Sequence, residues 1–519
     1  MNAPRHPAAF ESPLVVVSNR GPVSFSVDEG GELSAVRGSG GLVTALAGAL
    51  FESDATWLAA AGTDGDRAVA ASGRPIDLAP AGRASFIDVP EERYLGYYNG
   101  VSNRILWLLH HYLFDLSYLP TWNAETRAIW DDYREVNRQF AQALDRESDR
   151  QPVYLIQDYH LSLVPRFLRE LQPDALIAHF THTPFAGPAY LKVLPAPLLE
   201  ELLRGMLGAD VLGFQAEAWA ENFLLSVRDS LPDARVDLRR RRVHLDGRTV
   251  LVRTYPVSLD PGPLRLTSRD PEVKRIRREL ARWRGEAKLL LRVDRFELSK
   301  NIPRGYMAFD SFLADHPEWR GRVRFLSLLP RSRAEIPEYE TYAARSLEAA
   351  DAINAKYGPD WIPIEIRTEE NYHQAVAAYG MYDALIVNPI FDGMNLVAME
   401  GPLVNKRHGA VILSHNAGAY ARLGRHAIGV NPFDVAETAA AIHQALEMPD
   451  EERIRRARGL TRAVLTSSPV RWLTAQLRDL DRARAPEEPG GSEPGEHVEE
   501  PFGTVDREVG HGHEIGGSF

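Results

Sequence analysis

The amino-acid sequence predicts an α/β protein of two domains, each built on a parallel β-sheet. Three observations lead to this expectation. The chain has 519 residues, which is too long for a single compact core. Short β-branched apolar runs alternate with segments of helical periodicity, an alternation that gives parallel sheets with right-handed crossovers. The alternation is interrupted at Pro256–Pro261 and then starts again.

The first half of the chain carries the first set of predicted strands. Each is a short apolar run that ends in polar residues, as buried parallel strands do. The runs are Pro13–Arg20, Val153–His160, Ala175–His182 and Asp210–Gln215. A Gly-rich turn at Gly38–Gly41 precedes a helical segment, and Val236–Val252 alternates around Asp246 and Gly247, which predicts a hairpin.

The second half repeats the pattern. Its predicted strands are Lys288–Arg295, Val323–Leu329, Ile362–Thr368, Asp383–Pro389 and Gly409–His415. We therefore expect domains at 1–255 and 256–469, a helix at 470–483 that returns to the first domain, and a disordered tail over 484–519. The tail prediction follows from its richness in Pro, Gly, Glu and His.

Composition excludes several classes of protein. A formal net charge of −11 argues against a nucleic-acid-binding surface. The chain has no cysteine, so disulfides, thiolate catalysis and cysteine-bound metals are excluded. Neither a signal-peptide-like start nor an apolar run of about 18 residues is present, so we expect a cytoplasmic protein without a membrane partner.

Polar side chains at the predicted strand ends are the candidate site, because ligands of open α/β sheets bind outside the carboxyl ends of the strands. Arg295 and Lys300 suit a diphosphate, with a surface ion pair as the alternative. Asp392 and Glu400 can accept hydrogen bonds from sugar hydroxyls. The alternatives are that Asp392 is a helix cap and Glu400 is a solvated helix residue. The candidates are Asn19, Arg20, Asp158, His182, Arg295, Lys300, Arg333, Asp392, Gly393 and Glu400.

The remaining motifs carry less information. The turn at Gly38–Gly41 can bind an anion or simply be tight. His182 is either structural or catalytic. The histidines at 110, 111, 179 and 182 lack a metal-ligand spacing, so no metal is expected. The basic run Arg239–Arg242 is interpreted as a solvated hairpin strand.

Seven motifs in order resemble the trehalose-6-phosphate synthase family. They are VVVSNR, YYNGVSNRILW (Tyr97–Trp107), QDYHLSLVP (Gln157–Pro165), HTPF, RVDRFELSKN, NAKYG (Asn354–Gly358) and DGMNLVAME. The resemblance covers Leu14 to Leu480. It implies a retaining glycosyltransferase of the GT-B fold, with two Rossmann-like domains facing across a cleft.

The resemblance also implies residue roles. The glucose 6-phosphate acceptor would be held by Arg20, Tyr98, Trp107 and Arg333. The nucleotide-sugar donor would be held by Gly41, Arg295, Lys300, Asp392, Gly393, Met394, Asn395, Leu396, Val397 and Glu400. The catalytic set would be Asp158, His182, Arg295 and Lys300.

The implied reaction transfers glucose from UDP- or GDP-glucose to glucose 6-phosphate with retention, and gives trehalose 6-phosphate. The leaving diphosphate is thought to help deprotonate the acceptor, so no carboxylate pair of glycosidase geometry is needed. Neither metal nor cofactor is implied, and the partners are the small-molecule substrates. Self-association is common in the family, but the sequence leaves the nucleobase and a homo-oligomer open.

Several positions depart from the family pattern. Gln157 stands where a histidine is usual, Thr183 and Ala186 alter HIPFP, Met399 replaces a lysine, and Ala59–Gly62 reads AAAG instead of GWSG. Alternatives are therefore a glycerol 3-phosphate acceptor, or a pseudoglycosyltransferase that couples a nucleotide-activated cyclitol to an aminocyclitol phosphate. A silent homologue and a dinucleotide oxidoreductase are disfavoured, since Arg295, Lys300 and Asp392 are present and GxGxxG is missing.

Overall fold

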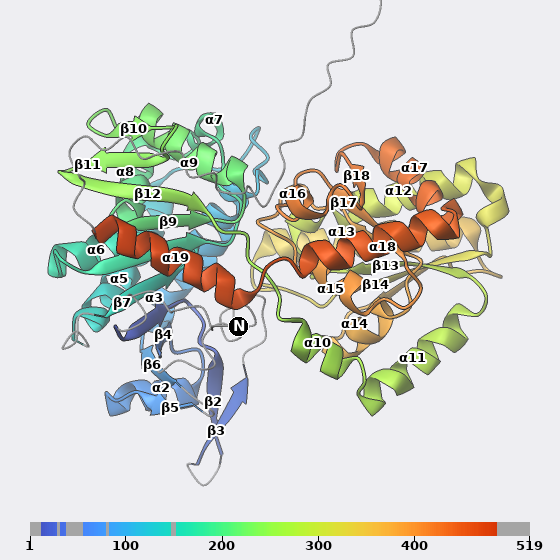
Figure 1. Cartoon of the computed structure of the whole chain (residues 1–519), viewed down its shortest axis with the longest axis horizontal. Coiled ribbons are helices and arrows are strands. Elements are labelled where there is room, and N and C mark those ends of the chain that lie inside the picture. Colours follow the sequence, from blue (N-terminus) through green and yellow to red (C-terminus); the bar gives the residue numbers. More distant parts are fainter. Residues whose placement is uncertain (1–11, 29–31, 38–54, 79–81, 147–151, 485–519) are drawn as a thin grey trace, which may run out of the picture. The chain divides into compact units, whose positions relative to one another are not determined.

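A computed structural model describes residues 12–28, 32–37, 55–78, 82–146 and 152–484 (Figure 1). The Gly-rich turn with Gly41, the segment after it and the predicted tail lie outside the described residues. Within these residues, none of the helices is long and apolar enough to cross a bilayer.

The first sheet has ten strands and is parallel at its centre. Its order is β10-β11-β12-β9-β8-β7-β1-β4-β6-β5, with β10 (Arg235–Asp237), β11 (Arg242–Leu245), β12 (Arg248–Thr254), β9 (Val211–Phe214), β8 (Leu176–Thr181), β7 (Val153–Gln157), β1 (Leu14–Val17), β4 (Thr56–Ala60), β6 (Arg83–Ile87) and β5 (Ile76–Asp77). The predicted hairpin forms β11 and β12, and Asp246 and Gly247 both have positive φ at its turn. A separate ribbon pairs β2 (Val23–Val27) with β3 (Leu33–Arg37).

The second sheet has six strands, all parallel. Its order is β15-β14-β13-β16-β17-β18, with β15 (Ile364–Arg367), β14 (Val323–Leu328), β13 (Lys288–Val293), β16 (Ala384–Val387), β17 (Ala410–Ser414) and β18 (Ile428–Val430). Five of these strands lie within the predicted apolar runs. Four of them, β13, β14, β16 and β17, are largely buried on both faces, which is why their runs are mostly apolar, whereas β15 reads IEIR and is buried at Ile364.

Helices cover the sheets and bury the apolar side chains of the strands. In β1, Val15 and Val17 belong to the core on one face while Leu14 and Val16 belong to the core on the other. The helices up to Ser230 are α2 (Asp64–Ser72), α3 (Glu91–Leu95), the π-helix η2 (Gly96–Leu106), α4 (Trp107–His110), α5 (Ala124–Arg146), η3 (Tyr159–Leu161), α6 (Val164–Leu171), α7 (Pro188–Leu191), α8 (Ala196–Met206) and α9 (Glu217–Ser230).

The later helices accompany the second sheet, with one exception. They are α10 (Pro261–Thr267), α11 (Pro271–Arg284), η4 (Leu298–Lys300), α12 (Ile302–Asp315), η5 (Pro317–Trp319), α13 (Pro337–Tyr357), α14 (Tyr372–Tyr379), α15 (Val397–Val404), α16 (Tyr420–Leu423), α17 (Val435–Glu447), α18 (Asp450–Val464) and α19 (Pro469–Arg484).

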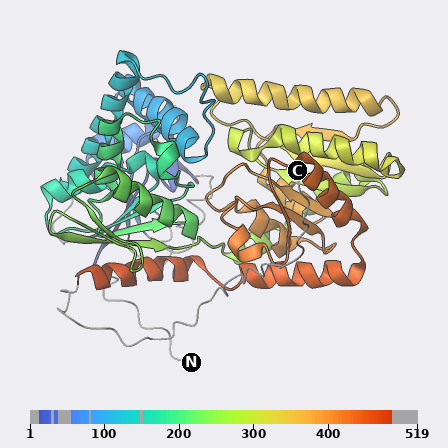
Figure 2. The same cartoon turned by 90° about the horizontal axis from the view of Figure 1, so that it is seen from above.

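The exception is α19, which lies along β8, β9 and β12 of the first sheet (Figures 1 and 2). Its Trp472 is 3% exposed, and the indole Nε1 donates a hydrogen bond to the Tyr255 carbonyl at 3.0 Å. The Tyr255 hydroxyl donates in turn to Asp479 at 2.6 Å. A helix was expected at 470–483. The boundary expected at 255/256 falls in the segment between β12, which ends at Thr254, and β13, which begins at Lys288.

Candidate active site

The strand order itself indicates where ligands bind. In the first sheet the chain runs outward from β1 through β4 and β6, and outward on the other side from β7 through β8, so the order reverses between β1 and β7. In the second sheet it reverses between β13 and β16. Ligands of open α/β sheets bind at such reversals, outside the carboxyl ends of the strands. Arg20 and Asp158 follow β1 and β7, whereas Arg295 and Asp392 follow β13 and β16.

Asp158 and His182 are brought together by the backbone beyond β7 and β8. Asp158 has a φ of 73°, a conformation that costs free energy for a residue with a Cβ. Its Oδ1 accepts a hydrogen bond from the His182 backbone N–H at 3.0 Å. Burial raises the pKa of Asp158 to about 6, and the N–H groups of His182 and Tyr159 oppose that rise. The strained backbone therefore aims a carboxylate that titrates near neutral pH.

The predicted acceptor residues form two cation–aromatic pairs. Arg20 donates to the Tyr98 hydroxyl at 3.0 Å, and its guanidinium lies over the Tyr98 ring. The guanidinium carbon of Arg333 lies 5.1 Å from the centroid of the Trp107 ring. Arg333 also donates to the hydroxyl of Tyr339 at 2.8 Å. Guanidinium groups held against aromatic rings are pre-oriented for a phosphate.

The two pairs are connected through the residues that follow Asp158. The Tyr98 ring stacks on His160 with centroids 5.7 Å apart, and His160 stacks on Tyr159 at 4.0 Å. The Tyr159 hydroxyl accepts from Arg333 at 3.5 Å. Arg20 and Arg333 therefore line one continuous wall, although they come from the two different sheets.

Glu297 joins the acceptor side to the diphosphate pair. Its Oε1 accepts from Arg295 Nε at 2.8 Å and lies 3.9 Å from Arg333 Nη1. Burial alone would raise the pKa of Glu297, but the charges of Arg295, Arg333 and Lys300 hold it well below the ordinary value. One buried carboxylate thus stays ionised among three cations. The Arg295 side chain remains 55% exposed, so its outer nitrogens are open to a ligand.

Lys300 and Asp392 form the other half of the predicted donor site. Lys300 Nζ donates to Asp392 Oδ2 at 2.6 Å, and Asn395 Nδ2 donates to the same oxygen at 3.1 Å. Burial alone lowers the pKa of Lys300, but Asp392, Asp294 and Glu297 outweigh it and raise the pKa. Both predicted cations therefore already have a carboxylate partner, which a diphosphate would have to share.

The segment after Asp392 touches the first sheet directly. A side chain at Gly393 would overlap the carbonyl oxygen of His182, so only glycine fits. Met394 is buried, Asn395 has a φ of 71°, and Leu396 and Val397 are half-buried where α15 begins. The predicted donor residues from Asp392 to Val397 thus occupy one turn, in which Gly393 lies against the His182 carbonyl.

Glu400 lies one turn into α15. It is held by the Tyr379 hydroxyl, which donates to Oε2 at 3.0 Å. Burial raises the pKa of Glu400 to about 7, although the hydrogen bond from Tyr379 opposes the rise. Glu400 is therefore not the solvated helix residue of the alternative interpretation, and its side chain loses its negative charge as the pH falls through about 7.

The sequence prediction missed several site residues. Glu297, Tyr159 and Tyr339 contact the predicted residues but were not singled out. The first two stand inside the motifs RVDRFELSKN and QDYHLSLVP, so their position next to predicted residues was the available signal. Tyr339 at the start of α13 carried no local signal, because only the fold brings it to Arg333. Gly41 lies outside the described residues.

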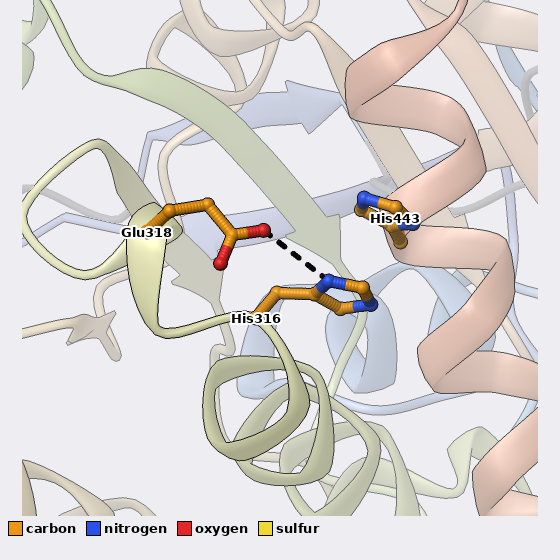
Figure 3. A group of neighbouring side chains, drawn as sticks. All are labelled: His316, Glu318 and His443. Carbon is orange, nitrogen blue, oxygen red and sulfur yellow. Dashed lines mark ion pairs between the residues drawn. The ribbon is translucent and has the colours of Figure 1, made fainter.

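One group of three potential metal ligands occurs among the described residues, away from the predicted site (Figure 3). His316 follows α12, Glu318 belongs to η5 and His443 lies on α17. His316 Nδ1 lies 3.3 Å from Glu318 Oε1, and the two imidazole rings are stacked with centroids 3.7 Å apart and planes at 14°. Nearly parallel rings direct their lone pairs in parallel, so one ring must turn before both can bind one ion. The group is arranged as a histidine–carboxylate pair with a stacked imidazole.

Comparison with known proteins identifies the family of the chain. The family model described as glycosyltransferase family 20 matches residues 12–482. The chain belongs to glycosyltransferase family 20. It is therefore a glycosyltransferase, with the two-sheet fold of that family.

Three similar proteins place the chain within family 20. It is 34% identical over 489 residues to the trehalose-6-phosphate synthase of Mycobacterium marinum, covering 91% of this chain and 95% of that protein. It is 32% identical over 481 residues to the validamine 7-phosphate valienyltransferase of Streptomyces hygroscopicus subsp. jinggangensis, covering 90% and 94%. A UDP-forming alpha,alpha-trehalose-phosphate synthase from Burkholderia xenovorans, solved with glucose-6-phosphate, superposes with a TM-score of 0.79 at 27% identity, covering 90% and 100%.

Proposed function

We propose that this family 20 enzyme transfers glucose from UDP-glucose to glucose 6-phosphate, forming trehalose 6-phosphate with retention of configuration. The mycobacterial relative is named a trehalose-6-phosphate synthase, and the Burkholderia relative is described as UDP-forming and was solved with glucose-6-phosphate. The observation that carries the proposal is the position of Glu297 between Arg295, Arg333 and Lys300. Because Lys300 also pairs with Asp392, two carboxylates face the three cations, and the positive charge left over suits phosphorylated substrates.

The division of labour follows from the contacts. Arg333, over Trp107 and next to Tyr159, would hold the acceptor phosphate together with Arg20. Arg295 and Lys300 would hold the donor diphosphate, whose negative charge grows as it leaves. Catalysis then rests on orientation and on electrostatic stabilisation of the leaving group.

The donor sugar would be held by the turn after β16. Asp392 is oriented by Lys300 and Asn395, so its carboxylate can accept hydrogen bonds from sugar hydroxyls. Glu400 would accept hydrogen bonds from the ribose. Proton transfer from the acceptor to the leaving diphosphate needs no further base. We also propose that the reaction requires neither metal nor cofactor, and that the enzyme acts in the cytoplasm.

The test is release of nucleoside diphosphate by purified protein, with UDP-, GDP- and ADP-glucose each paired with glucose 6-phosphate or glycerol 3-phosphate. We expect UDP release that depends on glucose 6-phosphate, with trehalose 6-phosphate as product. Arg295→Ala should lower kcat by about 100- to 1000-fold, the usual cost of removing one group that stabilises developing charge. Arg333→Ala should chiefly raise the KM for glucose 6-phosphate.

Arg331→Ala is the matched control. Arg331 pairs with Glu340 at the surface, 2.5 Å away and half-exposed, so its loss should leave both kinetic constants unchanged. Near-wild-type turnover in Arg295→Ala, with an unchanged circular dichroism spectrum, would overturn the diphosphate assignment. An unchanged acceptor KM in Arg333→Ala would overturn the phosphate assignment.

The Streptomyces relative supplies a second candidate, transfer of a nucleotide-activated cyclitol to an aminocyclitol phosphate. A change next to His182 favours it. The Thr183 hydroxyl is buried and has no hydrogen-bond partner in the described part of the chain, where the family pattern has an apolar residue. If no sugar nucleotide is consumed with either phosphorylated acceptor, this candidate replaces the first.

A further inference from the structure

A chain of four hydrogen bonds runs through the imidazole of His182. At one end the backbone N–H of Val257 donates to Gln215 Oε1 at 2.9 Å. Because a backbone N–H can only donate, it fixes the oxygen of the Gln215 amide on its own side. The amide nitrogen then faces His182 and lies 3.2 Å from Nδ1. Since the amide nitrogen can only donate, Nδ1 of His182 must accept.

The other end of the chain gives the same answer independently. Gln157 Nε2 donates to the backbone carbonyl of Leu155 at 3.2 Å, and a carbonyl can only accept. The oxygen of the Gln157 amide is thereby directed at His182 Nε2, 3.0 Å away. An amide oxygen accepts, so Nε2 must carry the proton. Two anchors on two different segments of backbone therefore specify one tautomer.

The surroundings of the ring keep it in this state. Phe180 packs edge-on against the ring of His182 with centroids 4.6 Å apart, and Trp472 of α19 lies at 6.3 Å. Burial and the neighbouring His179 lower the pKa of His182 to about 3. A proton on Nδ1 would also point at the N–H groups of Gln215. Both polar ends of the imidazole are thus occupied by side-chain amides.

We propose that Gln157 and Gln215 are positioning residues that hold His182 as a neutral imidazole protonated on Nε2. His182 is then excluded as the base that removes the acceptor proton, because Nδ1 is occupied by Gln215 and Nε2 already carries a proton. Its contribution is to fix a backbone segment. The N–H of His182 aims Asp158, and its carbonyl meets Gly393 of the opposite sheet. The catalytic meaning of this inference rests on the proposed function, but the tautomer itself does not.

Gln157 is the informative position, since the family pattern has a histidine there. A histidine at 157 could donate or accept and could itself titrate, whereas an amide oxygen accepts at every pH. The titratable groups nearest the His182 ring are His179 on β8 and Asp158 after β7. The aromatic rings on its other sides carry no charge.

The test is nitrogen-15 NMR of the substrate-free protein labelled at histidine, with the His182 signals assigned by their loss in His182→Asn. We expect a protonated Nε2 and an unprotonated Nδ1, unchanged from pH 5.5 to 8.5. A proton on Nδ1, or a titration of His182 within that range, would overturn the proposal. No substrate is present, so the outcome does not depend on the proposed function.

Two variants test the positioning role in turnover. Gln157→Met removes the acceptor at similar volume and should lower kcat by about 10- to 100-fold with little change in either KM. Gln157→Glu keeps an acceptor but places a carboxylate at Nε2, so it should raise the pKa of His182 and add an ionisation to the pH profile of kcat. Gln139→Met is the control, because Gln139 lies on α5 and its side chain donates to Glu135 on the same helix at 3.4 Å. Wild-type kcat in Gln157→Met, or a wild-type pH profile in Gln157→Glu, would contradict the positioning role.

Discussion

Replacing Gly393 by alanine tests whether the two sheets must meet as the structure has them. A Cβ at this position would overlap the carbonyl oxygen of His182 and lie 2.8 Å from its carbonyl carbon and 3.2 Å from that of Thr183. Uncrowded carbon atoms stay about 3.5–4.0 Å apart, so the turn after β16 must retreat by roughly 1 Å. A displacement of that size in a catalytic site costs on the order of 100-fold in rate, or about 2.7 kcal/mol of activation free energy.

The assay is steady-state UDP release at saturating glucose 6-phosphate, with thermal denaturation of the same preparations. Gly321→Ala is the control, because that glycine has a φ of 76° and open space around it. It should lower folding stability by about 1–2 kcal/mol and leave kcat unchanged. Gly393→Ala should instead lower kcat and leave folding stability unchanged. If Gly393→Ala keeps more than a tenth of wild-type kcat, close apposition of the two loops is not required.

Three further predictions concern other parts of the molecule. Burial raises the pKa of Glu400 to about 7, so the ionised fraction of Glu400 falls as the pH drops. We therefore expect kcat/KM for the donor to fall tenfold per pH unit below pH 7. In Glu400→Gln, kcat/KM for the donor should not change between pH 6.5 and 8. Trp472→Ala should lower the free energy of unfolding by about 3–5 kcal/mol in urea titration, and a loss below 1 kcal/mol would show that α19 contributes little packing. Asp294→Ala leaves the buried charge of Arg292, 3.0 Å away, without its partner and should lower the free energy of unfolding by about 3–5 kcal/mol. The double change Arg292→Met with Asp294→Leu removes both charges and should recover most of that loss. Equal losses in the two variants would refute the buried-charge argument.

The sequence predicted the central strands well because their physics is local. A strand buried on both faces is largely apolar, as in β7 and β13, and such runs are visible without knowledge of their partner strands. Strands β4 and β6 were absent from the prediction. They contain small or polar residues, as in TWLAA and RASFI, so their apolar signal is weak.

The candidate site residues at strand ends were selected on a similarly local property. Their position after a strand is a sequence property, and the parallel sheets bring them to common edges. What the sequence did not indicate is which charges neutralise each other. The Glu297 carboxylate looks like any surface acid in RVDRFELSKN until the fold places Arg333 beside it. The same holds for Gln215, whose partners come from β8 and from the segment after β12.

The return of α19 to the first sheet has a consequence for how the protein is made. The strands that α19 covers are complete once β12 ends at Thr254, but the covering helix spans Pro469–Arg484. At synthesis rates of about 5–20 residues per second, the apolar surface around Phe180 and Tyr255 stays uncovered on the ribosome for roughly 10–45 seconds. The first sheet can close its core only after the second has been synthesised. A chain that stops at the end of α18 would leave that surface permanently exposed, so α19 should protect the newly made protein against aggregation.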